Sequence, residues 1–322
     1  MLSLKRALRL AETACRQNGI ARSGRWWVRI CWLSIGGPVR CGALPPSALV
    51  GYVTLLYKKG DRTELANWRP ITLLTVDYKI LAKLMVLRLR EVMARVVHPD
   101  QTCGVPGRMC GMNLALVRDA LAWADQRRVP LALLGLDQEK AFDRVSHAFL
   151  FALLRRMGFG PGFVAMVRLL YAGAVSRVIV NGHCSGLIEQ RGGVRQGCPL
   201  SPLLYVLYLE PLAERLRREP AFQGLHIPGA GGTRAKVSVY ADDATLFLGR
   251  DEDFRAVSGI LEAFSDATGA RINRSKSAVL YAGAWAGRSD VPGGSPCARM
   301  VSRSWVLSSG ERTAPRRTGA SP

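Results

Sequence analysis

Apolar and polar residues follow two alternating patterns along the middle of the chain, and each pattern predicts one type of secondary structure. Short apolar runs bounded by turn residues predict strands and hairpins. We expect them at residues 50–57, 67–71, 131–136, 177–190, 237–248 and 277–281. Apolar residues that repeat at helical spacing predict helices at residues 78–97, 113–126, 141–157, 202–218 and 253–268.

The order of these elements indicates the fold class. From Leu131 onward the chain runs strand, helix, hairpin, helix, hairpin, helix, strand. This order predicts an α+β fold in which an antiparallel sheet has helices on one face. The basic segment 1–40 shows no sustained period and stays unassigned. Segment 284–322 is rich in Gly, Ser, Pro and Arg, and we expect it to be a disordered tail.

The composition adds a class of partner to this fold. With 322 residues and 48% hydrophobic content, the chain has enough apolar material for a buried core. Its 45 Lys and Arg against 24 Asp and Glu give a formal charge of +21, which is typical of proteins that bind phosphate-rich partners. The longest uncharged stretch, residues 41–57, is shorter than the roughly 20 residues of a spanning helix, so no membrane span is expected.

The cysteines and the N-terminus bear on the location of the protein. Eight cysteines occur without a Cys-x-x-Cys pair or regular spacing, which favours reduced thiols inside the cell and argues against a zinc site. Residues 1–30 are rich in Arg and poor in acids, as in a mitochondrial transit peptide. Basic flanks are also common in nucleic-acid binders, and we do not expect mitochondrial targeting.

The segment Tyr240-Ala241-Asp242-Asp243 is the strongest candidate for chemistry. It places two adjacent carboxylates at the turn between two apolar, strand-like runs. Side chains so close repel each other unless a cation neutralises them, and oxygen ligands favour Mg²⁺. The tetrapeptide alone is weak evidence, since Asp is common in turns, where it bonds its own backbone.

Asp137 supplies a third carboxylate at the end of the apolar run 131–136. If the two strands pair side by side, Asp137, Asp242 and Asp243 come together. Three carboxylates can hold two Mg²⁺ ions about 4 Å apart, as phosphoryl transfer requires. The alternative for Asp137 is the N-cap of the following helix.

Five segments resemble the reverse transcriptase domain of non-LTR (LINE-type) retrotransposons in their order and spacing, and especially the Tx-type vertebrate elements. The resemblance covers about residues 44–283. The segments are Asn67–Ile71 (NWRPI), Leu136–Asp143 (LDQEKAFD), Gly193–Pro202 (GVRQGCPLSP), Tyr240–Asp243 (YADD) and Ile272–Ser277 (INRSKS).

The resemblance implies right-hand polymerase fingers at residues 41–130 and a palm at 131–283, with a fingers hairpin inserted near 175–192 and a thumb absent or truncated. It implies an RNA-directed DNA polymerase that adds dNTPs to a primer 3′-hydroxyl along an RNA template. Its cofactor would be two Mg²⁺ ions, with Mn²⁺ as an alternative. It also implies a ribonucleoprotein of the nucleus and cytoplasm. The oligomeric state is not indicated.

The resemblance further assigns roles to single residues. The carboxylates matching Asp137 and Asp242 bind both metals, and the one matching Asp243 is more peripheral. The residue matching Phe142 packs under the deoxyribose and excludes a 2′-hydroxyl, because a rigid ring close to C2′ leaves no room for another oxygen. Ordinary core packing is the alternative for Phe142.

Other matched residues would bind the nucleotide. Gln196 would lie over the incoming base pair and Gly197 would let the backbone approach closely, unless their segment is only a helix-entry turn. Arg69 would grip the triphosphate, with Lys59 nearby, since a guanidinium suits bidentate phosphate contact; lysines in such a turn are often only solvated. Lys276 is a candidate general acid for the pyrophosphate leaving group.

Two further readings compete with an active polymerase. One is a catalytically inactive retrotransposon fragment, or a nucleic-acid-binding module that uses the basic face around Arg88, Arg90 and Arg95. That face is also consistent with a merely solvated helix surface. The other is an intron maturase or telomerase relative, which the segments around Asn67 and Asp137 disfavour.

Overall fold

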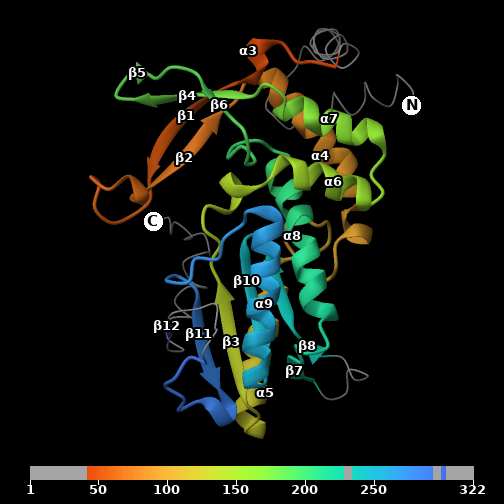
Figure 1. Ribbon diagram of the computed structural model, residues 1–322, viewed down its shortest axis with the longest axis vertical. Helices are drawn as coiled ribbons and strands as arrows, with labels where there is room; N and C mark the ends of the chain where they lie inside the picture. Colours follow the sequence, from red (N-terminus) through yellow and green to blue (C-terminus); the bar gives the residue numbers. More distant parts are fainter. Residues whose placement is uncertain (1–41, 228–233, 293–298, 302–322) are drawn as a thin grey trace, which may run out of the picture. The chain divides into compact units, whose positions relative to one another are not determined.

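A computed structural model describes residues 42–227, 234–292 and 299–301 of the chain (Figure 1). These residues form two compact units. The first unit contains the described residues up to Val97 together with Phe142–Tyr208, and the second contains His98–Ala141 and the described residues from Leu209 onward. The chain crosses between these units three times, so their limits do not coincide with the expected fingers at 41–130 and palm at 131–283, which stay a prediction.

A sheet of five strands organises the first unit. The strands are β1 (Val50–Tyr57), β2 (Trp68–Leu73), β4 (Val175–Val180), β5 (His183–Cys184) and β6 (Ile188–Glu189). Strand β1 pairs antiparallel with β2 and parallel with β4, and β4 carries both β5 and β6. The turn between β4 and β5 has positive φ at Asn181 and Gly182, as the predicted Asn-Gly hairpin requires.

Helices pack beside this sheet in the same unit. They are α3 (Pro46–Leu49), η1 (Leu65–Asn67), α4 (Val76–Val96), η2 (Ala141–Arg144), α6 (His147–Arg156), α7 (Pro161–Tyr171) and the first part of α8 (Ser201–Arg218). Helix α4 begins after Thr75, whose side chain accepts a hydrogen bond from the Tyr78 amide, and it buries the apolar face that predicted it.

The helix predicted at residues 141–157 is interrupted, and the prediction was wrong there. A short 3₁₀ turn, η2, comes first, and α6 then begins after Ser146, whose hydroxyl accepts a hydrogen bond from the Phe149 amide and caps the new helix. Helix α7 was not predicted at all. It starts at Pro161, a residue that favours the first position of a helix but that reads as a loop between two glycines.

The second unit is built on another sheet of five strands, in the order β12-β11-β3-β10-β9. Its strands are β3 (Leu131–Leu136), β9 (Val237–Tyr240), β10 (Asp243–Leu248), β11 (Ala278–Ala282) and β12 (Arg299–Met300). All pairs are antiparallel except that between β11 and β12. A separate ribbon joins β7 (Leu225–His226) and β8 (Arg234–Ala235).

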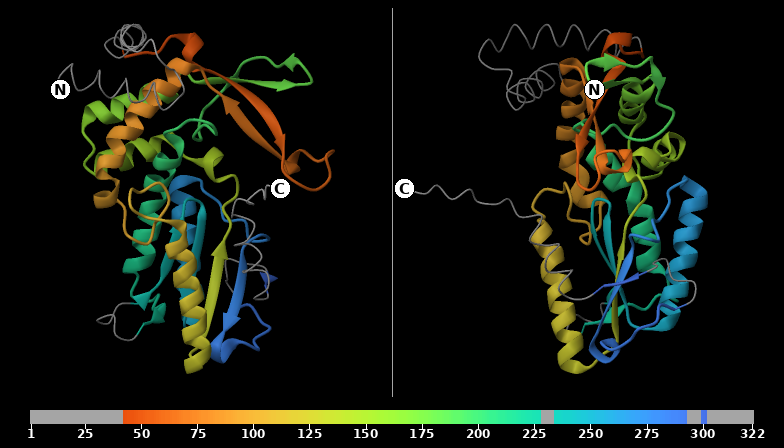
Figure 2. Two further views of the ribbon diagram at one scale, coloured as in Figure 1. Left: turned by 180° about the vertical axis from the view of Figure 1, so that it is seen from behind. Right: turned by 90° about the vertical axis from the view of Figure 1, so that its left-hand side faces the viewer.

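Helices cover both faces of this second sheet, as Figure 2 shows. Helix α9 (Asp251–Thr268) lies on one face and α5 (Cys110–Arg127) on the opposite face. Ala120 and Ala124 of α5 pack against Leu131, Leu133 and Phe247 in the core. Strand β3 is therefore buried on both sides, which explains its apolar run. The α+β class is confirmed, and the second covered face comes from a helix that precedes Leu131 in the chain.

The segment expected to be a disordered tail contains regular structure where it is described. The short helix η3 (Gly283–Trp285) follows β11 directly, and β12 extends the sheet. The prediction of disorder was wrong for these residues. Residues 293–298 and 302–322 lie outside the described residues, as do residues 1–41, which include the unassigned segment 1–40.

Two general features complete the fold. None of the helices in the described part of the chain is both long and apolar enough to cross a membrane. The four cysteines within this part are free thiols: Cys103, Cys110, Cys184 and Cys198.

Candidate active site

The second sheet brings Asp137 and Asp243 to the same end of two neighbouring strands. Strand β3 ends at Leu136, which pairs with Ala244 of β10, so the next residue of each strand end is an aspartate. Asp242 lies in the two-residue loop closed by the pair Tyr240↔Asp243. Because facing residues of antiparallel strands have Cβ atoms about 4.5–5.5 Å apart, Asp137 and Asp243 are close neighbours.

The charges of these side chains act on one another. Burial raises the pKa of Asp243, and the negative charges of Asp242 and Asp137 raise it further. Within the described ranges, Asp137, Asp242 and Asp243 form no ion pair with Lys, Arg or His. The sheet therefore gathers negative charge at this end and provides no cation of its own to balance it.

The donor chemistry of this end suits a hard divalent cation, because carboxylate oxygens are the ligands that Mg²⁺ prefers. In their present rotamers, the described His, Cys, Asp and Glu side chains include no group of three that is arranged to hold a metal ion. The three carboxylates thus match Mg²⁺ in charge and in the type of donor atom. Ligation by all three carboxylates stays a prediction.

The backbone of Asp137 is fixed on both sides by the segment Ile272–Ser277. Its N–H donates to the hydroxyl of Ser277 over 3.0 Å, and its carbonyl accepts from the Asn273 N–H over 2.8 Å. Ser277 is completely buried. Gln138 and Ile272 form an isolated antiparallel bridge beside them. Ser277 ends the segment INRSKS named from the sequence, but its role in supporting Asp137 was not predicted.

Lys276, the candidate general acid, belongs to the same segment, whose neighbours Asn273 and Ser277 bond the backbone of Asp137. Its side chain is exposed, and its backbone N–H bonds the carbonyl of Asn273. An exposed, flexible ammonium group is compatible with a role in proton transfer and with simple solvation.

In the first unit, the Phe142 ring stacks on Tyr205, with ring centroids 4.9 Å apart and planes inclined by 10°. Tyr205 is fully buried, whereas Phe142 is only half-buried. One face of the Phe142 ring therefore packs on the core while part of it stays accessible. This arrangement accommodates both the packing and the sugar-gate hypotheses.

Gln196 and Gly197 lie on the loop that precedes α8, against strand β2. The Gln196 carbonyl accepts a hydrogen bond from the Thr72 N–H over 2.7 Å. Gly197 has φ +113°, and a Cβ there would lie 2.4 Å from the Thr72 carbonyl oxygen, so no larger residue fits. Gly197 therefore lets its own backbone approach β2, and its predicted role in nucleotide binding stays a prediction.

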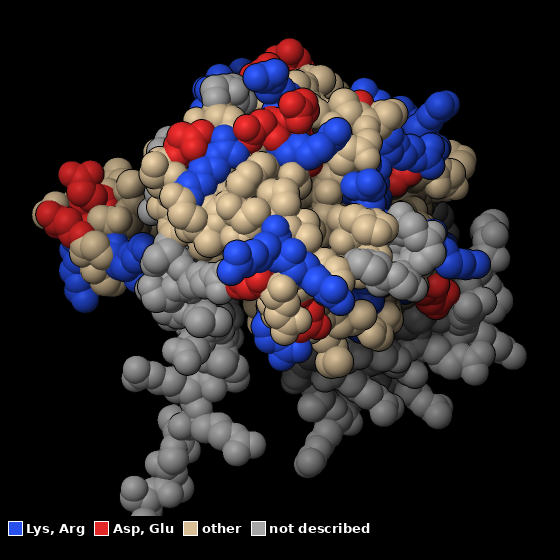
Figure 3. All heavy atoms as spheres, turned by 90° about the horizontal axis from the view of Figure 1, so that it is seen from below, with Lys and Arg blue, Asp and Glu red and all other residues tan. Residues whose placement is uncertain are grey.

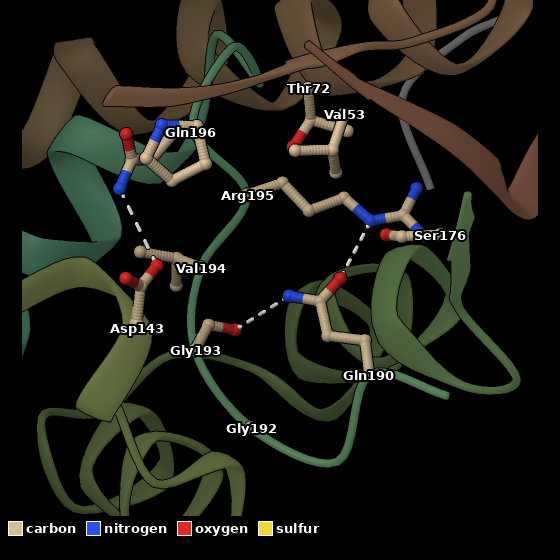
Figure 4. Close-up of a pocket in the computed structure, with 11 residues that line it drawn as sticks. Val53, Thr72, Asp143, Ser176, Gln190, Gly192, Gly193, Val194, Arg195 and Gln196 are labelled. Atoms are coloured by element: carbon tan, nitrogen blue, oxygen red, sulfur yellow. Dashed lines mark hydrogen bonds between the residues drawn. The ribbon is translucent and has the colours of Figure 1, made fainter. Parts of the chain in front are cut away.

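The same loop borders a cavity of about 190 Å³ in the first unit. Figure 4 shows the side chains of Gln196, Asp143, Arg195 and Gln190 around it, with Gln196 Nε2 donating to Asp143 over 3.4 Å. The remaining lining residues come from β1, β2, β4 and the loop itself: Val53, Pro70, Thr72, Ser176, Gly192, Gly193 and Val194.

Arg195 is a buried cation that the sequence pattern did not reveal. Only 2% of it is exposed, and its guanidinium donates to the carbonyls of Leu49 and Val175 over 2.5 and 3.0 Å and to the Gln190 side chain over 2.8 Å. It also lies over the Tyr78 ring, 5.3 Å from the centroid. Arg195 thus ties the end of α3, strand β4 and the Gln196 loop together. It has no described carboxylate partner, and its buried Nη1 atom has no hydrogen-bond partner among the described residues.

Arg69 and Lys59 are both exposed on the β1–β2 hairpin. Arg69 of β2 pairs with Leu56 of β1, and Lys59 lies in the connecting loop. That loop is held by its own contacts, such as the hydrogen bond from Trp68 Nε1 to the Arg62 carbonyl. Arg69 and Lys59 are accessible to a phosphate group, as they would be if only solvated.

The basic residues of the chain are mixed with acidic ones on part of its surface. On the face in Figure 3, groups of Lys and Arg side chains lie interspersed with Asp and Glu. Arg88, Arg90 and Arg95 are exposed on α4. The proposed contact of that helix with template backbone stays a prediction.

Comparisons with known proteins give the same indication as the sequence segments. The family Reverse transcriptase (RNA-dependent DNA polymerase) matches residues 57–305. The Transposon TX1 uncharacterized 149 kDa protein of Xenopus laevis is 43% identical over 242 residues, which cover 75% of this chain and 18% of that protein. A Retrovirus-related Pol polyprotein from type-1 retrotransposable element R2 of Popillia japonica is 27% identical over 249 residues, covering 76% and 34%.

Solved structures resemble the chain in fold. The apo telomerase from Candida Tropicalis truncated from its C-terminal domain matches with a TM-score of 0.53 and 13% identity, over 74% of this chain and 51% of that one. The chain spans about a fifth to a third of the two retrotransposon relatives. By its family match and its relatives, the chain belongs to the reverse transcriptase (RNA-dependent DNA polymerase) family, in the non-LTR, LINE-type group.

Proposed function

We propose that this chain is the RNA-directed DNA polymerase domain of a LINE-type retrotransposon and that it adds dNTPs to a primer 3′-hydroxyl along an RNA template. The observation that carries the proposal is the pairing of β3 with β10, which puts Asp137 and Asp243 side by side in a chain of this family.

The carboxylates of Asp137 and Asp242 would hold two Mg²⁺ ions, and Asp243 would add negative charge at the edge of the site. When bound, such ions lower the pKa of an attacking hydroxyl and stabilise the charge on a leaving pyrophosphate. The protein's part is to fix the positions of the carboxylates. The β3–β10 ladder and the bonds to Ser277 and Asn273 support this role.

In the first unit, we assign nucleotide binding to residues of the hairpin and of the Gln196 loop. The exposed guanidinium of Arg69 would bind the triphosphate, with Lys59 beside it as a further cation. Gln196 and Gly197 would support the base pair, and Phe142 would select the sugar. Lys276 is the candidate proton donor to pyrophosphate.

Primer extension tests the proposed reaction. We expect the purified chain to extend oligo(dT) on poly(rA) in the presence of Mg²⁺, and EDTA to stop the reaction. Asp242→Asn should remove extension almost entirely while the fold persists, because an amide lacks the charge that holds the ion. A variant that keeps extending the primer would overturn the assignment of Asp242.

The alternative of a binding module predicts a different result. In that case wild type and Asp242→Asn would bind primer–template equally and neither would extend it, with or without Mg²⁺. Binding by either protein should weaken steeply as salt rises, because cationic side chains release counterions from phosphates. Extension by the wild type alone favours the polymerase.

Phe142 has its own test, because stacking on Tyr205 leaves two roles open. If the ring is the sugar gate, Phe142→Val should raise the ratio of rNTP to dNTP incorporation with little loss of dNTP use. If it only packs, truncation should destabilise the fold by about 2–4 kcal/mol and lower both activities together. The incorporation ratio and a denaturant titration of the same variant separate the two.

A further inference from the structure

A buried glutamine, Gln101, lies beside the hairpin that carries Asp242 and Asp243. Its residue is 2% exposed. The segment around it runs along the free edge of β9, where Gln101 forms a parallel bridge with Val239. The Val239 N–H bonds the Asp100 carbonyl over 2.9 Å, and the Thr102 N–H bonds the Val239 carbonyl over 3.1 Å. Gln101 is thus fixed in place by backbone pairing on both sides.

The side chain of Gln101 reaches the turn itself. Its Oε1 accepts hydrogen bonds from the Ala241 N–H over 3.2 Å and from the Cys103 N–H over 2.9 Å. The Ala241 N–H lies at the first position of the two-residue loop, outside the β9–β10 ladder. The Ala241 N–H has no acceptor within the β9–β10 ladder, and the Gln101 side chain provides one.

Ala241 also holds an unusual backbone conformation, with φ +55°. A positive φ is costly for a residue with a Cβ and persists only where surrounding contacts enforce it. The hydrogen bond from Gln101 is such a contact, and it acts on the residue directly before the two carboxylates.

The segment that carries Gln101 is itself anchored within the second unit. The Arg108 guanidinium donates to the carbonyls of His98 and Gln101 over 2.6 and 2.8 Å. The His98 N–H donates to the Glu210 carboxylate of α8 over 3.3 Å. The segment that holds the turn is therefore itself bonded to helix α8.

We propose that Gln101 is a positioning residue for the metal-binding carboxylates, because its side-chain oxygen holds the strained Ala241 turn from which Asp242 and Asp243 project. The proposal rests on the proposed function for its metal site, and the hydrogen bond to Ala241 can be tested separately from it.

Two variants of Gln101 separate positioning from packing. Gln101→Met keeps a similar volume but removes the acceptor oxygen, whereas Gln101→Glu keeps an oxygen in the same place. Positioning predicts that Gln101→Met weakens Mn²⁺ binding by roughly tenfold and that Gln101→Glu binds at least as well as wild type. Packing predicts the reverse order, because a buried apolar side chain is tolerated better than a buried charge. Free Mn²⁺ is measured by electron paramagnetic resonance on the full chain.

The adjacent residue offers a matched control. Thr102 is 3% exposed, and its hydroxyl has no hydrogen-bond partner among the described residues. Thr102→Val should leave Mn²⁺ binding unchanged. Unchanged binding in Gln101→Met, or an equal loss in Gln101→Glu, would overturn the positioning role.

A second measurement does not depend on metal. Hydrogen exchange of the Ala241 amide should be protected in wild type and in Thr102→Val, and should become at least tenfold faster in Gln101→Met. Equal exchange in all three proteins would refute the proposal. If exchange changes as expected but Asp242→Asn binds Mn²⁺ as well as wild type does, the proposed metal site fails while the hold of Gln101 on the turn stands.

Discussion

The two units handle buried charge in opposite ways. In the first unit, the Arg195 guanidinium is almost fully enclosed. Carbonyl and amide oxygens accept hydrogen bonds from its Nε and Nη2 atoms and the Tyr78 ring faces it, while its Nη1 atom is buried without a hydrogen-bond partner among the described residues. In the second unit, Asp243 is crowded by two like charges and has no described cation beside it. A buried charge that several hydrogen bonds hold can support the fold, whereas a cluster of like charges without a cation costs stability and indicates a binding function.

Replacing one member of the unbalanced cluster gives the largest expected effect on activity. Asp137→Asn should abolish primer extension without lowering the melting temperature, because the change relieves repulsion and leaves the backbone bonds to Ser277 and Asn273 intact. The pKa of Asp243 should fall, since a neighbouring negative charge disfavours its ionised form. Extension assays, thermal melts and an NMR titration of Asp243 measure the three quantities. A large loss of stability in Asp137→Asn would contradict the view that the acidic cluster costs stability.

Replacing the hydrogen-bonded charge of Arg195 should have the opposite effect, a loss of stability. Arg195→Met leaves the buried carbonyls of Leu49 and Val175 without their side-chain donor, and we expect a loss of about 3 kcal/mol in the free energy of unfolding. Arg195→Lys keeps the charge but not the fork of donors, and should fall between wild type and Met. Denaturant unfolding measures the loss, and hydrogen exchange in β1 and β4 locates it. Full stability in the Met variant would contradict the structural role of Arg195.

A smaller effect is expected at Ser277, whose hydroxyl supports the backbone of Asp137. Ser277→Ala removes the acceptor of a buried N–H, and we expect a loss of about 1 kcal/mol in stability. The Mg²⁺ concentration for half-maximal extension should rise as well, since the Asp137 backbone is held less firmly. Arg274→Ala, at an exposed position of the same segment whose side chain pairs with Glu262, is the control. Equal metal dependence in both variants would leave Ser277 with a structural role only.

The sequence was sufficient to predict the strands β3, β9, β10 and β11 of the second sheet and the neighbouring positions of two aspartates, but not β12. The run 131–136 is wholly apolar because helices cover both faces of β3, and such a run is visible without a structure. The acidic hairpin follows from two apolar runs separated by a short polar turn. Both signals are local, since they depend on a few adjacent residues.

The supporting residues were out of reach for the opposite reason. Ser277 bonds a residue 140 positions away, Gln101 also spans 140 positions to Ala241, and Arg195 reaches back 146 positions to Leu49. No periodicity within a short window records such partners, and a lone Ser, Gln or Arg is ordinarily a surface residue. Helix α7 was missed because Gly160, Pro161 and Gly162 resemble a loop, although proline suits the first turn of a helix.

The place of β3 in its sheet has a consequence for the order in which the site opens. Strand β3 is bonded on one side to β10 and on the other to β11, whereas β9 lies at the end of the strand order and its outer edge is bonded only at Val239, by the segment around Gln101. Central strands open only in global unfolding, while outer ones fray at a lower free energy. The amide protons of β9 should therefore exchange with solvent before those of β3. A divalent ion bound by both Asp137 and Asp242 would slow the exchange of β9 in proportion to its occupancy, because it binds only the closed form.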